Sequence, residues 1–405
     1  MSRRSSTTRA AVDDDRSAMS AVNQPGKPGL LRELNDRAAL ALLLEHGPLT
    51  RARIGELTGL SKPTASQVVA RLEAAGLIAE VGEVTGARGP NAATYAARGD
   101  RMLAVAVDVR PYRVVSTVVD AAGTEHPVAE VELAHNASER SAVGDIRAAI
   151  DAACSAAGVD RERVVTAMVG LQGAVDPRTD DLAFTGLMPG WPRRQVRAEL
   201  EKGLEIDVRI DNDVNLAAVA EREHGSVEAD EDFALLWLGD GLGVALHLRG
   251  ELHRGAAGGA GEIGYLPVVT GDGSSSADLQ DLVGGVAVTR VARAHGVRGR
   301  RLDQVLDALA TSDERDAVLS ELAPRVAAGV LPVLAVLAPH RVVLGGPTGM
   351  AGGQALADQV RAHIRRTTRW SPTVSASTVP DQPVLRGARA VVGADLRSRL
   401  LDLVS

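Results

Sequence analysis

Cysteine and aromatic residues are scarce in this sequence, and each shortage excludes a class of protein. Cys154 is the single cysteine in 405 residues, which excludes an internal disulfide framework and a cysteine-rich zinc cluster. Aromatic residues make up 2% of the chain, while hydrophobic residues as a whole make up 45%. These proportions are those of an ordinary globular protein whose cores must be aliphatic.

Long hydrophobic runs are also missing. A helix that crosses a bilayer needs about 18 or more apolar residues in a row, and runs such as Val330–Ala338 are much shorter. Residues 1–29 are polar, rich in Ser, Arg, Asp and Pro, and contain no hydrophobic signal segment. We therefore expect residues 1–29 to form a disordered tail and the protein to be cytoplasmic, with no membrane partner.

Negative charge predominates in the chain as a whole but not in its N-terminal part. The net charge is −7, yet residues 1–98 hold 13 Lys and Arg against 10 Asp and Glu, and the remainder holds 32 against 42. A mildly basic segment on an acidic body suits a small DNA-binding module attached to a soluble sensor. The same distribution also fits an extension that serves solubility alone.

The hydrophobic pattern divides the chain at about residue 98. Residues 30–98 show helical spacing followed by a hairpin pattern, whereas short buried strands alternate with helices over residues 99–405. Strands are predicted at Leu103–Asp108, Val114–Asp120, Val164–Val169, Asp207–Ile210 and Arg341–Leu344, and helices at Gln195–Lys202, Val214–His224 and Asp316–Leu337. Pro324 and Pro332 are expected to kink or split the last helix. The alternation predicts an α/β domain.

One pattern occurs twice in that domain. Ala104–Asp120 and Ala234–Leu248 each contain a strand, a short loop and a second strand, and a glycine follows each of them, at Gly123 and Gly250. Two such hairpins, each opening one half of the domain, predict a duplicated, two-lobed architecture with a cleft between the lobes. Two unrelated hairpins are the alternative, because α/β proteins contain many.

Residues 50–75 have the spacing of a helix-turn-helix. Thr50 is a favourable N-cap, Gly59 suits the tight turn that ends the first helix, and Ser61 caps the second. Pro63 lies in the first turn of the second helix, where no backbone hydrogen bond is lost. A helical hairpin that merely packs on the next domain is the alternative, but it does not account for both caps and the hairpin that follows.

We expect DNA contacts from the second helix, from the start of the first, and from a glycine-rich wing at residues 82–90. Small hydroxyls and an amide suit base edges, and cations suit phosphates or an adjacent minor groove. The predicted DNA-binding residues are Arg51, Arg53, Ser61, Lys62, Thr64, Ser66, Gln67, Arg71 and Arg88.

The segment "RARIGELTGLSKPTASQVVARLEAAGLI", followed by "GARGP", resembles the N-terminal domain of regulators in the repressor–ORF–kinase (ROK) family. The resemblance continues through "GLQGAVDP", "DNDVNLAAVAE", "LGDGLGVALHLRGELHRGAAGGAGEIGY", "VVLGGP" and "LRGA". The family comprises sugar-responsive repressors and glucokinase-like enzymes. The resemblance implies a mainly α winged helix-turn-helix at residues 30–98 and a two-lobed actin/hexokinase-like (ribonuclease H-like) α/β domain at 99–405.

The phosphate-binding loop departs from the pattern of the family's kinases. Those enzymes carry an Asp followed by two glycines and a Thr, whereas this chain has Asp108-Val109-Arg110-Pro111-Tyr112. Side chains replace both glycines, and Pro111 has no N–H to donate, so the backbone cannot approach phosphates closely. A second loop, Gly239–Gly243, keeps its glycines but places the carboxylate of Asp240 among them. We expect no productive ATP binding, no catalytic residue and no cofactor.

The implied sugar pocket is also altered. Tyr265 stands where the family has a zinc-binding His, Leu187 replaces an Asn, and Gly271–Gln280 lacks the family's three cysteines, which predicts that no metal is bound. The remaining candidate ligand-binding residues are Asn212, Asp213, Glu262 and Gln280. Asp213 matches the family's catalytic base, but capping of the following helix or hydrogen bonding to a sugar is the preferred interpretation. A pocket that binds nothing, or binds something other than a sugar, stays open.

The sequence therefore predicts a DNA-binding transcriptional regulator, a repressor of carbohydrate-related genes. It would bind an inverted-repeat operator in double-stranded DNA as a homodimer or homotetramer, with residues 99–405 serving as a non-catalytic sensor of a sugar or sugar phosphate and as the oligomerisation domain. An active ATP-dependent sugar kinase with an accessory DNA-binding head is the first alternative. An architectural regulator without an effector is the second.

Overall fold

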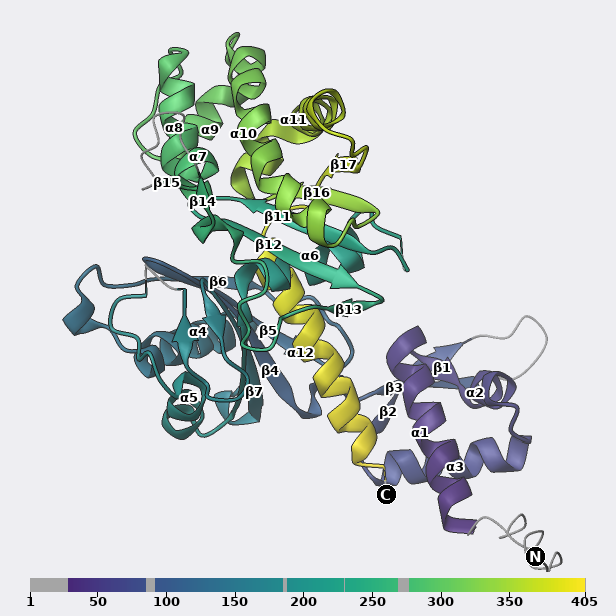
Figure 1. Cartoon of the computed structure of the whole chain (residues 1–405). Coiled ribbons are helices and arrows are strands. Elements are labelled where there is room, and N and C mark those ends of the chain that lie inside the picture. Colours follow the sequence, from purple (N-terminus) through teal and green to yellow (C-terminus); the bar gives the residue numbers. More distant parts are fainter. Residues whose placement is uncertain (1–27, 85–91, 185–187, 229, 269–276, 405) are drawn as a thin grey trace, which may run out of the picture. The chain divides into compact units, whose positions relative to one another are not determined.

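A computed structural model describes residues 28–84, 92–184, 188–228, 230–268 and 277–404 (Figure 1). The chain forms two compact units, one of Met1–Arg98 with Leu401–Ser405 and the other of Gly99–Leu400. Residues 1–27 of the predicted tail lie outside the described residues, as do Arg88 and Leu187. The first helix begins at Pro28, two residues inside the predicted tail.

The first unit is a three-helix domain with a small antiparallel sheet. Its helices are α1 (Pro28–His46), α2 (Arg51–Thr58) and α3 (Lys62–Ala74), and its strands are β1 (Leu49–Thr50), β2 (Ile78–Val84) and β3 (Ala92–Ala97) in the order β1-β3-β2. Fully buried side chains from several elements, among them Leu40, Ile54 and Tyr95, form the core. The β2–β3 hairpin is the wing of a winged helix.

The predicted caps and turn of this unit are confirmed. Thr50 accepts a hydrogen bond from the Arg53 backbone N–H at 3.2 Å, and Ser61 accepts one from the Thr64 N–H at 3.4 Å. Gly59 ends α2 with a φ of 71°, a conformation that a β-carbon would make costly. The two capping residues and Gly59 therefore determine where α2 ends and α3 begins.

The second unit contains two five-stranded sheets with the same strand order. The first runs β10-β7-β4-β5-β6 and the second β17-β16-β11-β12-β13. Each begins with an antiparallel hairpin (β4–β5 or β11–β12), adds an antiparallel edge strand (β6 or β13), and extends on the other side through two parallel strands. The repeated order confirms the predicted two-lobed α/β architecture.

The strand and helix bounds follow the predicted spans closely. The sheet strands are β4 (Leu103–Arg110), β5 (Arg113–Asp120), β6 (Val128–Glu132), β7 (Val164–Leu171), β10 (Asp207–Asn212), β11 (Phe233–Leu238), β12 (Leu242–Leu248), β13 (Glu251–Leu252), β16 (Arg341–Gly345) and β17 (Thr373–Ala376). Short strands pair outside the sheets, namely β8 (Ala174–Val175) with β9 (Leu182–Ala183) and β14 (Pro267–Val268) with β15 (Ala277–Asp278). Every predicted strand and helix of this unit agrees with an observed one to within two residues at each end.

Separate aliphatic cores support the two lobes. Helices α4 (Ala142–Ala157) and α5 (Val196–Leu204) complete the core of the first lobe. The core of the second lobe is completed by α7 (Leu279–Val283), α8 (Gly285–Ala294), α9 (Leu302–Ala310), α10 (Arg315–Val336) and α11 (Gly346–Thr367). Helix α6 (Asp213–His224) contacts strands of both sheets and crosses α12 (Pro383–Asp402) where Gly387 lies against the Leu216 carbonyl. A β-carbon at Gly387 would lie 1.8 Å from that oxygen, so this close crossing requires glycine.

Helix α10 excludes one of the two outcomes predicted for its prolines. Pro324 and Pro332 do not split it, and a single helix runs from Arg315 to Val336. Among the described residues it is the one helix long and apolar enough to span a membrane by length and composition alone. Ten of its residues are buried, and most of them pack in the core of the second lobe. This burial offsets the cost of about 3 kcal/mol that an interior proline imposes on a helix.

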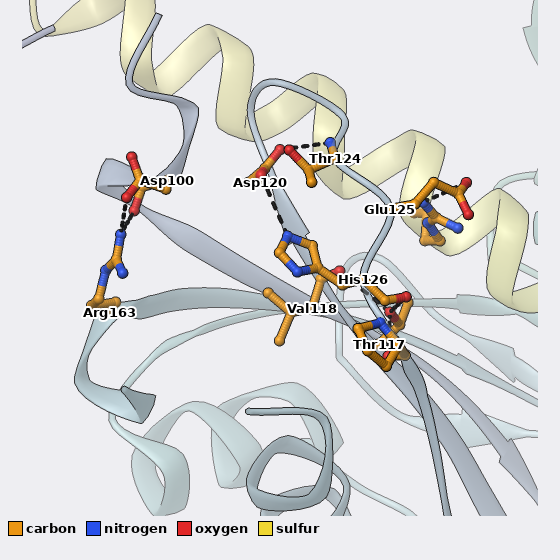
Figure 2. Close-up of polar contacts among 10 residues, drawn as sticks. Asp100, Thr117, Val118, Asp120, Thr124, Glu125, His126 and Arg163 are labelled. Atoms are coloured by element: carbon orange, nitrogen blue, oxygen red, sulfur yellow. Dashed lines mark hydrogen bonds and ion pairs between the residues drawn. The ribbon is translucent and has the colours of Figure 1, made fainter. Parts of the chain in front are cut away.

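The start of the second unit is anchored on its first sheet. A β-carbon on Gly99 would lie 2.5 Å from the Ala122 backbone nitrogen, so the chain can pass there only with glycine. The Arg163 guanidinium pairs with the Asp100 carboxylate at 2.8 Å (Figure 2). Asp120 at the end of β5 accepts a hydrogen bond from the Thr124 N–H at 3.0 Å, which closes the turn leading to β6 (Figure 2).

Candidate DNA-binding and ligand-binding sites

Helix α3 separates an apolar face from a polar one. Its buried residues are Ala65, Val68, Val69 and Leu72. The predicted contact residues Ser61, Lys62, Ser66 and Gln67 are exposed, and Thr64 is half-buried. The polar face therefore offers hydroxyls, an amide and one cation, groups that suit base edges and phosphates in a major groove.

Arg71 does not lie where the sequence predicted. Its side chain turns toward α1, where Nε and Nη2 donate to the two oxygens of Asp36 at 2.8 and 2.5 Å. The Asp36 side chain is 10% exposed, so the bidentate ion pair ties α3 to α1 inside the winged helix. The Arg71 guanidinium is thus bound to α1 rather than free on the outer face, and DNA contact by Arg71 stays a prediction.

The two arginines at the start of α2 are both engaged by neighbours. The Arg51 guanidinium donates to the Tyr95 hydroxyl and lies 4.9 Å from the centre of the Tyr95 ring. Arg53 pairs with Glu56 at 2.7 Å on the surface. Both arginine side chains are exposed, so phosphate contacts would compete with these internal pairs.

In the second unit, the segment at the position of the family's phosphate loop is a tight hairpin. Arg110 and Arg113 are paired across β4 and β5, and Pro111 and Tyr112 form the two-residue turn between them. Arg110 donates to the Asp108 carboxylate, with Nη2 at 2.8 Å and Nε at 2.9 Å. Burial raises the pKa of Asp108, and the Arg110 charge opposes that rise. The Arg110 guanidinium therefore forms an ion pair with Asp108, the carboxylate at the start of this loop.

A buried network holds the turn in place. Arg140, whose side chain is 1% exposed, donates from Nη1 to the Pro111 carbonyl at 2.6 Å. Its other guanidinium atoms bond Asp145, which also accepts from the Trp191 indole at 2.9 Å. This network was not predictable from the sequence, because Pro111 and Trp191 are 29 and 46 positions away from their partners and follow no motif. The carbonyl of Pro111 is therefore fixed, and the turn cannot rearrange around a phosphate without breaking buried bonds.

The four predicted ligand-binding residues line one cavity of about 160 Å³ between the lobes. Asn212 and Asp213 come from the first lobe, and Glu262 and Gln280 come from the second. Other lining residues, none of them predicted to bind a ligand, are Gln172, Phe184, Trp237, Asp240 and Tyr265. The cavity therefore combines carboxylates and amides with three aromatic rings.

Asn212, rather than Asp213, caps α6. Its side-chain oxygen accepts from the Val214 and Asn215 N–H groups, and its amide nitrogen donates to the Gly173 carbonyl at 3.1 Å. Asp213 is the first residue of the helix, and its Oδ1 also accepts from the Val214 N–H at 2.9 Å. The Asn212 amide is thus used structurally, whereas the Asp213 carboxylate faces the cavity.

Both cavity carboxyls have strongly raised pKa values. Burial, together with the charge of Asp108, raises the pKa of Asp213 to about 7. Burial raises the pKa of Glu262 to about 7 as well. Neither pairs with a Lys or Arg within the described ranges. Ligand hydroxyl groups could supply the hydrogen bonds that these carboxylates lack.

Metal-binding geometry is not found in the part of the chain that the structure describes, where no three His, Cys, Asp or Glu side chains cluster suitably. Tyr265, at the position of the family's zinc-binding His, instead donates its hydroxyl to the Phe184 carbonyl at 3.3 Å. Residues 271–276 of the predicted cysteine-free segment lie outside the described ranges, while Gln280 is exposed on α7. The absence of a metal stays a prediction.

A second, larger cavity of about 740 Å³ adjoins the altered phosphate loop. It is lined by Asp108, Arg110, Pro111 and Tyr112 from the first lobe, and by Gly239, Asp240, Gly346 and Pro347 from the second, among others. The fold thus retains a cleft next to the loop, although the loop itself has lost its glycines.

Comparison with known proteins identifies both parts of the chain. The ROK family matches residues 104–395, and the MarR family matches residues 33–89. The chain belongs to the ROK family. Its N-terminal part matches a MarR-type winged helix, which confirms the predicted winged helix-turn-helix.

Individual relatives are distant. An uncharacterised protein of Clostridium perfringens is 31% identical over 44% of this chain, and the match spans 60% of that protein's length. A putative xylose repressor of Caldicellulosiruptor sp. is 20% identical over 92% of this chain and 98% of its own length. The crystal structure of a ROK family transcriptional regulator, a homologue of the E. coli MLC protein, superposes with a TM-score of 0.65 at 19% identity, covering 92% of this chain and 98% of its own.

Proposed function

We propose that this ROK family member is a DNA-binding transcriptional repressor of carbohydrate-related genes, and that its kinase-like unit binds a sugar or sugar derivative without phosphorylating it. The xylose repressors among its relatives support this role, since one of them aligns over nearly the whole chain. We further propose that residues 30–98 bind an inverted-repeat operator and that residues 99–405 sense the effector and form the homodimer or homotetramer.

One combination of features carries this proposal. The chain joins a winged helix, whose α3 exposes Lys62, Ser66 and Gln67, to a ROK unit in which Arg110 pairs with Asp108 at the start of the phosphate loop. A kinase requires a backbone cradle for phosphates, and here Pro111 lacks an N–H while Arg140 holds its carbonyl. The described part of the winged helix therefore supports DNA binding, whereas the first phosphate loop of the kinase-like unit differs from that of the family's kinases.

DNA binding is tested by gel-shift titration of the full chain against fragments of its own genome. The fragment bound most tightly is then titrated with Lys62→Ala and Gln67→Ala variants. Loss of a bidentate base contact costs about 1–3 kcal/mol, so the Gln67 variant should bind its operator about 5- to 150-fold more weakly. Lys202→Ala removes an exposed lysine from α5 and serves as the matched control, with wild-type affinity expected. Binding without sequence preference, or unaffected by both α3 variants, would contradict the proposal.

An active sugar kinase with an accessory DNA-binding head is the second candidate. Asp213 favours it, because a carboxyl whose pKa is raised to about 7 is suited to accept a proton from a sugar hydroxyl. Incubation of the full chain with ATP, Mg²⁺ and a panel of pentoses and hexoses tests it. We expect no sugar phosphate above background, whereas phosphorylation that disappears in Asp213→Ala would establish the kinase.

A further inference from the structure

Aromatic side chains are concentrated at the ligand cavity. The chain contains only three Trp, three Tyr and two Phe residues, and one of each type lines the cavity that holds Asp213 and Glu262. The hydrophobic cores are built from aliphatic residues almost throughout, so packing alone does not require rings at this place. The enrichment indicates that Phe184, Trp237 and Tyr265 have a task in the cavity itself.

Phe184 and Tyr265 form a pair across the two lobes. Their ring centroids lie 5.5 Å apart, and their planes are inclined at 48°. Phe184 follows β9 in the first lobe, while Tyr265 belongs to the short helix Ile263–Tyr265 in the second. Both remain about half exposed, at 47% and 50%, so the pair presents ring surface to solvent at the cavity.

The backbone at Phe184 is held in an unfavourable conformation. Its φ is 54°, in the left-handed region that bulky residues seldom adopt. Gly259 makes room for the ring, because a β-carbon at that position would lie 3.0 Å from Phe184 Cε2. Strain of this kind persists where the surrounding structure and the function require one side-chain position. An exposed phenyl ring gains little from burial, so burial does not explain the strain.

The whole cavity, which Phe184 and Tyr265 line together with Asp213 and Glu262, has room for about one ring. Its volume of about 160 Å³ is smaller than the roughly 300–1,000 Å³ of clefts that enclose drug-sized ligands. Asp213 and Glu262 provide carboxylates for hydroxyl groups inside the cavity. A ligand longer than one ring would extend out of the cavity along the exposed surfaces of Phe184 and Tyr265, where the apolar face of a sugar or an aryl ring can stack.

We propose that Phe184 and Tyr265 form a second-ring subsite, so that the effector is a glycoside rather than a free monosaccharide. One sugar ring occupies the carboxylate end of the cavity. The ring attached to it, either a second sugar or an aryl group, stacks on the aromatic pair. This inference rests on the proposed function, in which the kinase-like unit binds a sugar.

Isothermal titration calorimetry on the full chain tests the subsite with matched ligands. Glucose and xylose provide one ring, cellobiose and xylobiose provide two sugar rings, and phenyl β-glucoside and phenyl β-xyloside provide a sugar with an aryl ring. We expect two-ring members of at least one series to bind about tenfold or more tightly than the monosaccharide. The disaccharide and phenyl arms distinguish a glycosyl from an aryl second ring.

Three variants show whether the aromatic pair is responsible. Phe184→Asn removes the ring but tolerates the left-handed backbone, and Tyr265→Ser removes its partner. In each variant, the affinity for the two-ring ligand should lie within about threefold of the same variant's affinity for the monosaccharide. Trp370→Ser deletes a ring of similar exposure that does not line this cavity, and it should behave as wild type.

The outcomes separate this inference from the proposed function. Equal affinity for one-ring and two-ring ligands, or a two-ring preference that survives both cavity variants, would overturn the subsite while leaving sugar sensing intact. Failure of every sugar to bind wild type that still binds its operator would overturn sugar sensing, and the subsite with it. Tight binding of phenol without a sugar would also overturn the subsite, because the carboxylate end would then be unnecessary.

Discussion

A few buried polar residues determine the shape of the altered phosphate loop. Arg140 and Asp145 are among the few charged residues buried in the described part of the second unit, and their ion pair spans only five positions of sequence. Arg140 also donates a hydrogen bond to the Pro111 carbonyl. One hydrogen-bond network therefore joins Asp145 in the first turn of α4 to the turn between β4 and β5. The stability of the lobe and the conformation of the loop are therefore linked.

We expect Asp145→Ala to destabilise the second unit by about 3–5 kcal/mol, because it leaves the Arg140 guanidinium buried without its counter-charge. Urea unfolding followed by circular dichroism measures the loss. Asp151→Ala is the matched control, since Asp151 and its partner Arg161 are largely solvent-exposed. That control should change stability by less than about 1 kcal/mol. Equal effects of the two variants would show that the Arg140 network adds nothing beyond a surface pair.

The cavity carboxyls give the second prediction at this scale. The pKa values of Asp213 and Glu262 rise from ordinary values near 4 to about 7 on folding. Between these limits the folded protein binds protons that the unfolded chain has released, so stability falls as pH rises from about 4 to 7 and levels off above. Asp213→Asn combined with Glu262→Gln should flatten this fall. Thermal unfolding across that pH range measures it, and an unchanged slope in the double variant would contradict the raised pKa values.

Residues that line the ligand cavity were predictable from the sequence only where they belong to a family motif. Asn212, Asp213, Glu262 and Gln280 were assigned through the family pattern, and all four line one cavity. Phe184 was not predicted, because its partner Tyr265 lies 81 positions away and no local periodicity joins them. The Arg140 contact to Pro111 was missed for the same reason. Long-range pairs depend on how the lobes fold, which local sequence spacing does not report.

At the scale of the element, local rules predicted most of the secondary structure. The caps of α2 and α3 followed from side-chain chemistry within three residues, and the strands from short apolar runs. Helix α10 differs, since a local rule predicted that Pro324 and Pro332 kink or split the helix, and the structure shows no split. Burial along the helix outweighs the missing hydrogen bonds, and burial is a property of the tertiary fold.

Helix α3 gives a prediction that separates structural from DNA-contacting cations. Arg71→Ala should lower the stability of the winged helix, because Asp36 loses its bidentate partner, yet leave the salt dependence of operator binding unchanged. Lys62→Ala should leave stability unchanged and reduce the slope of log affinity against log salt by about one. Anisotropy titrations at several salt concentrations, together with urea unfolding, measure both properties. A reduced salt slope in Arg71→Ala would restore the original prediction that this residue contacts phosphate.

The whole molecule is best understood from the repeated sheet order of its second unit. Two lobes with the same topology have separate aliphatic cores, and the cavity with Asp213 and Glu262 lies between them. A ligand that contacts both lobes stabilises the arrangement in which its contacts are complete. A two-lobed fold of this kind can therefore respond to a ligand even when the loop Asp108–Tyr112 does not bind phosphate.

Thermodynamic linkage gives the final prediction. If the effector shifts the protein away from its operator-binding state, saturating effector weakens operator binding by some factor, for which about 5- to 150-fold is typical. Saturating operator must then weaken effector binding by the same factor. Anisotropy of labelled operator measures the first quantity, and calorimetry of the effector with and without operator measures the second. Lys62→Ala with Gln67→Ala should keep the effector affinity of free wild type and abolish its dependence on operator. Effector binding that leaves operator affinity unchanged would mean that the kinase-like unit does not control the winged helix.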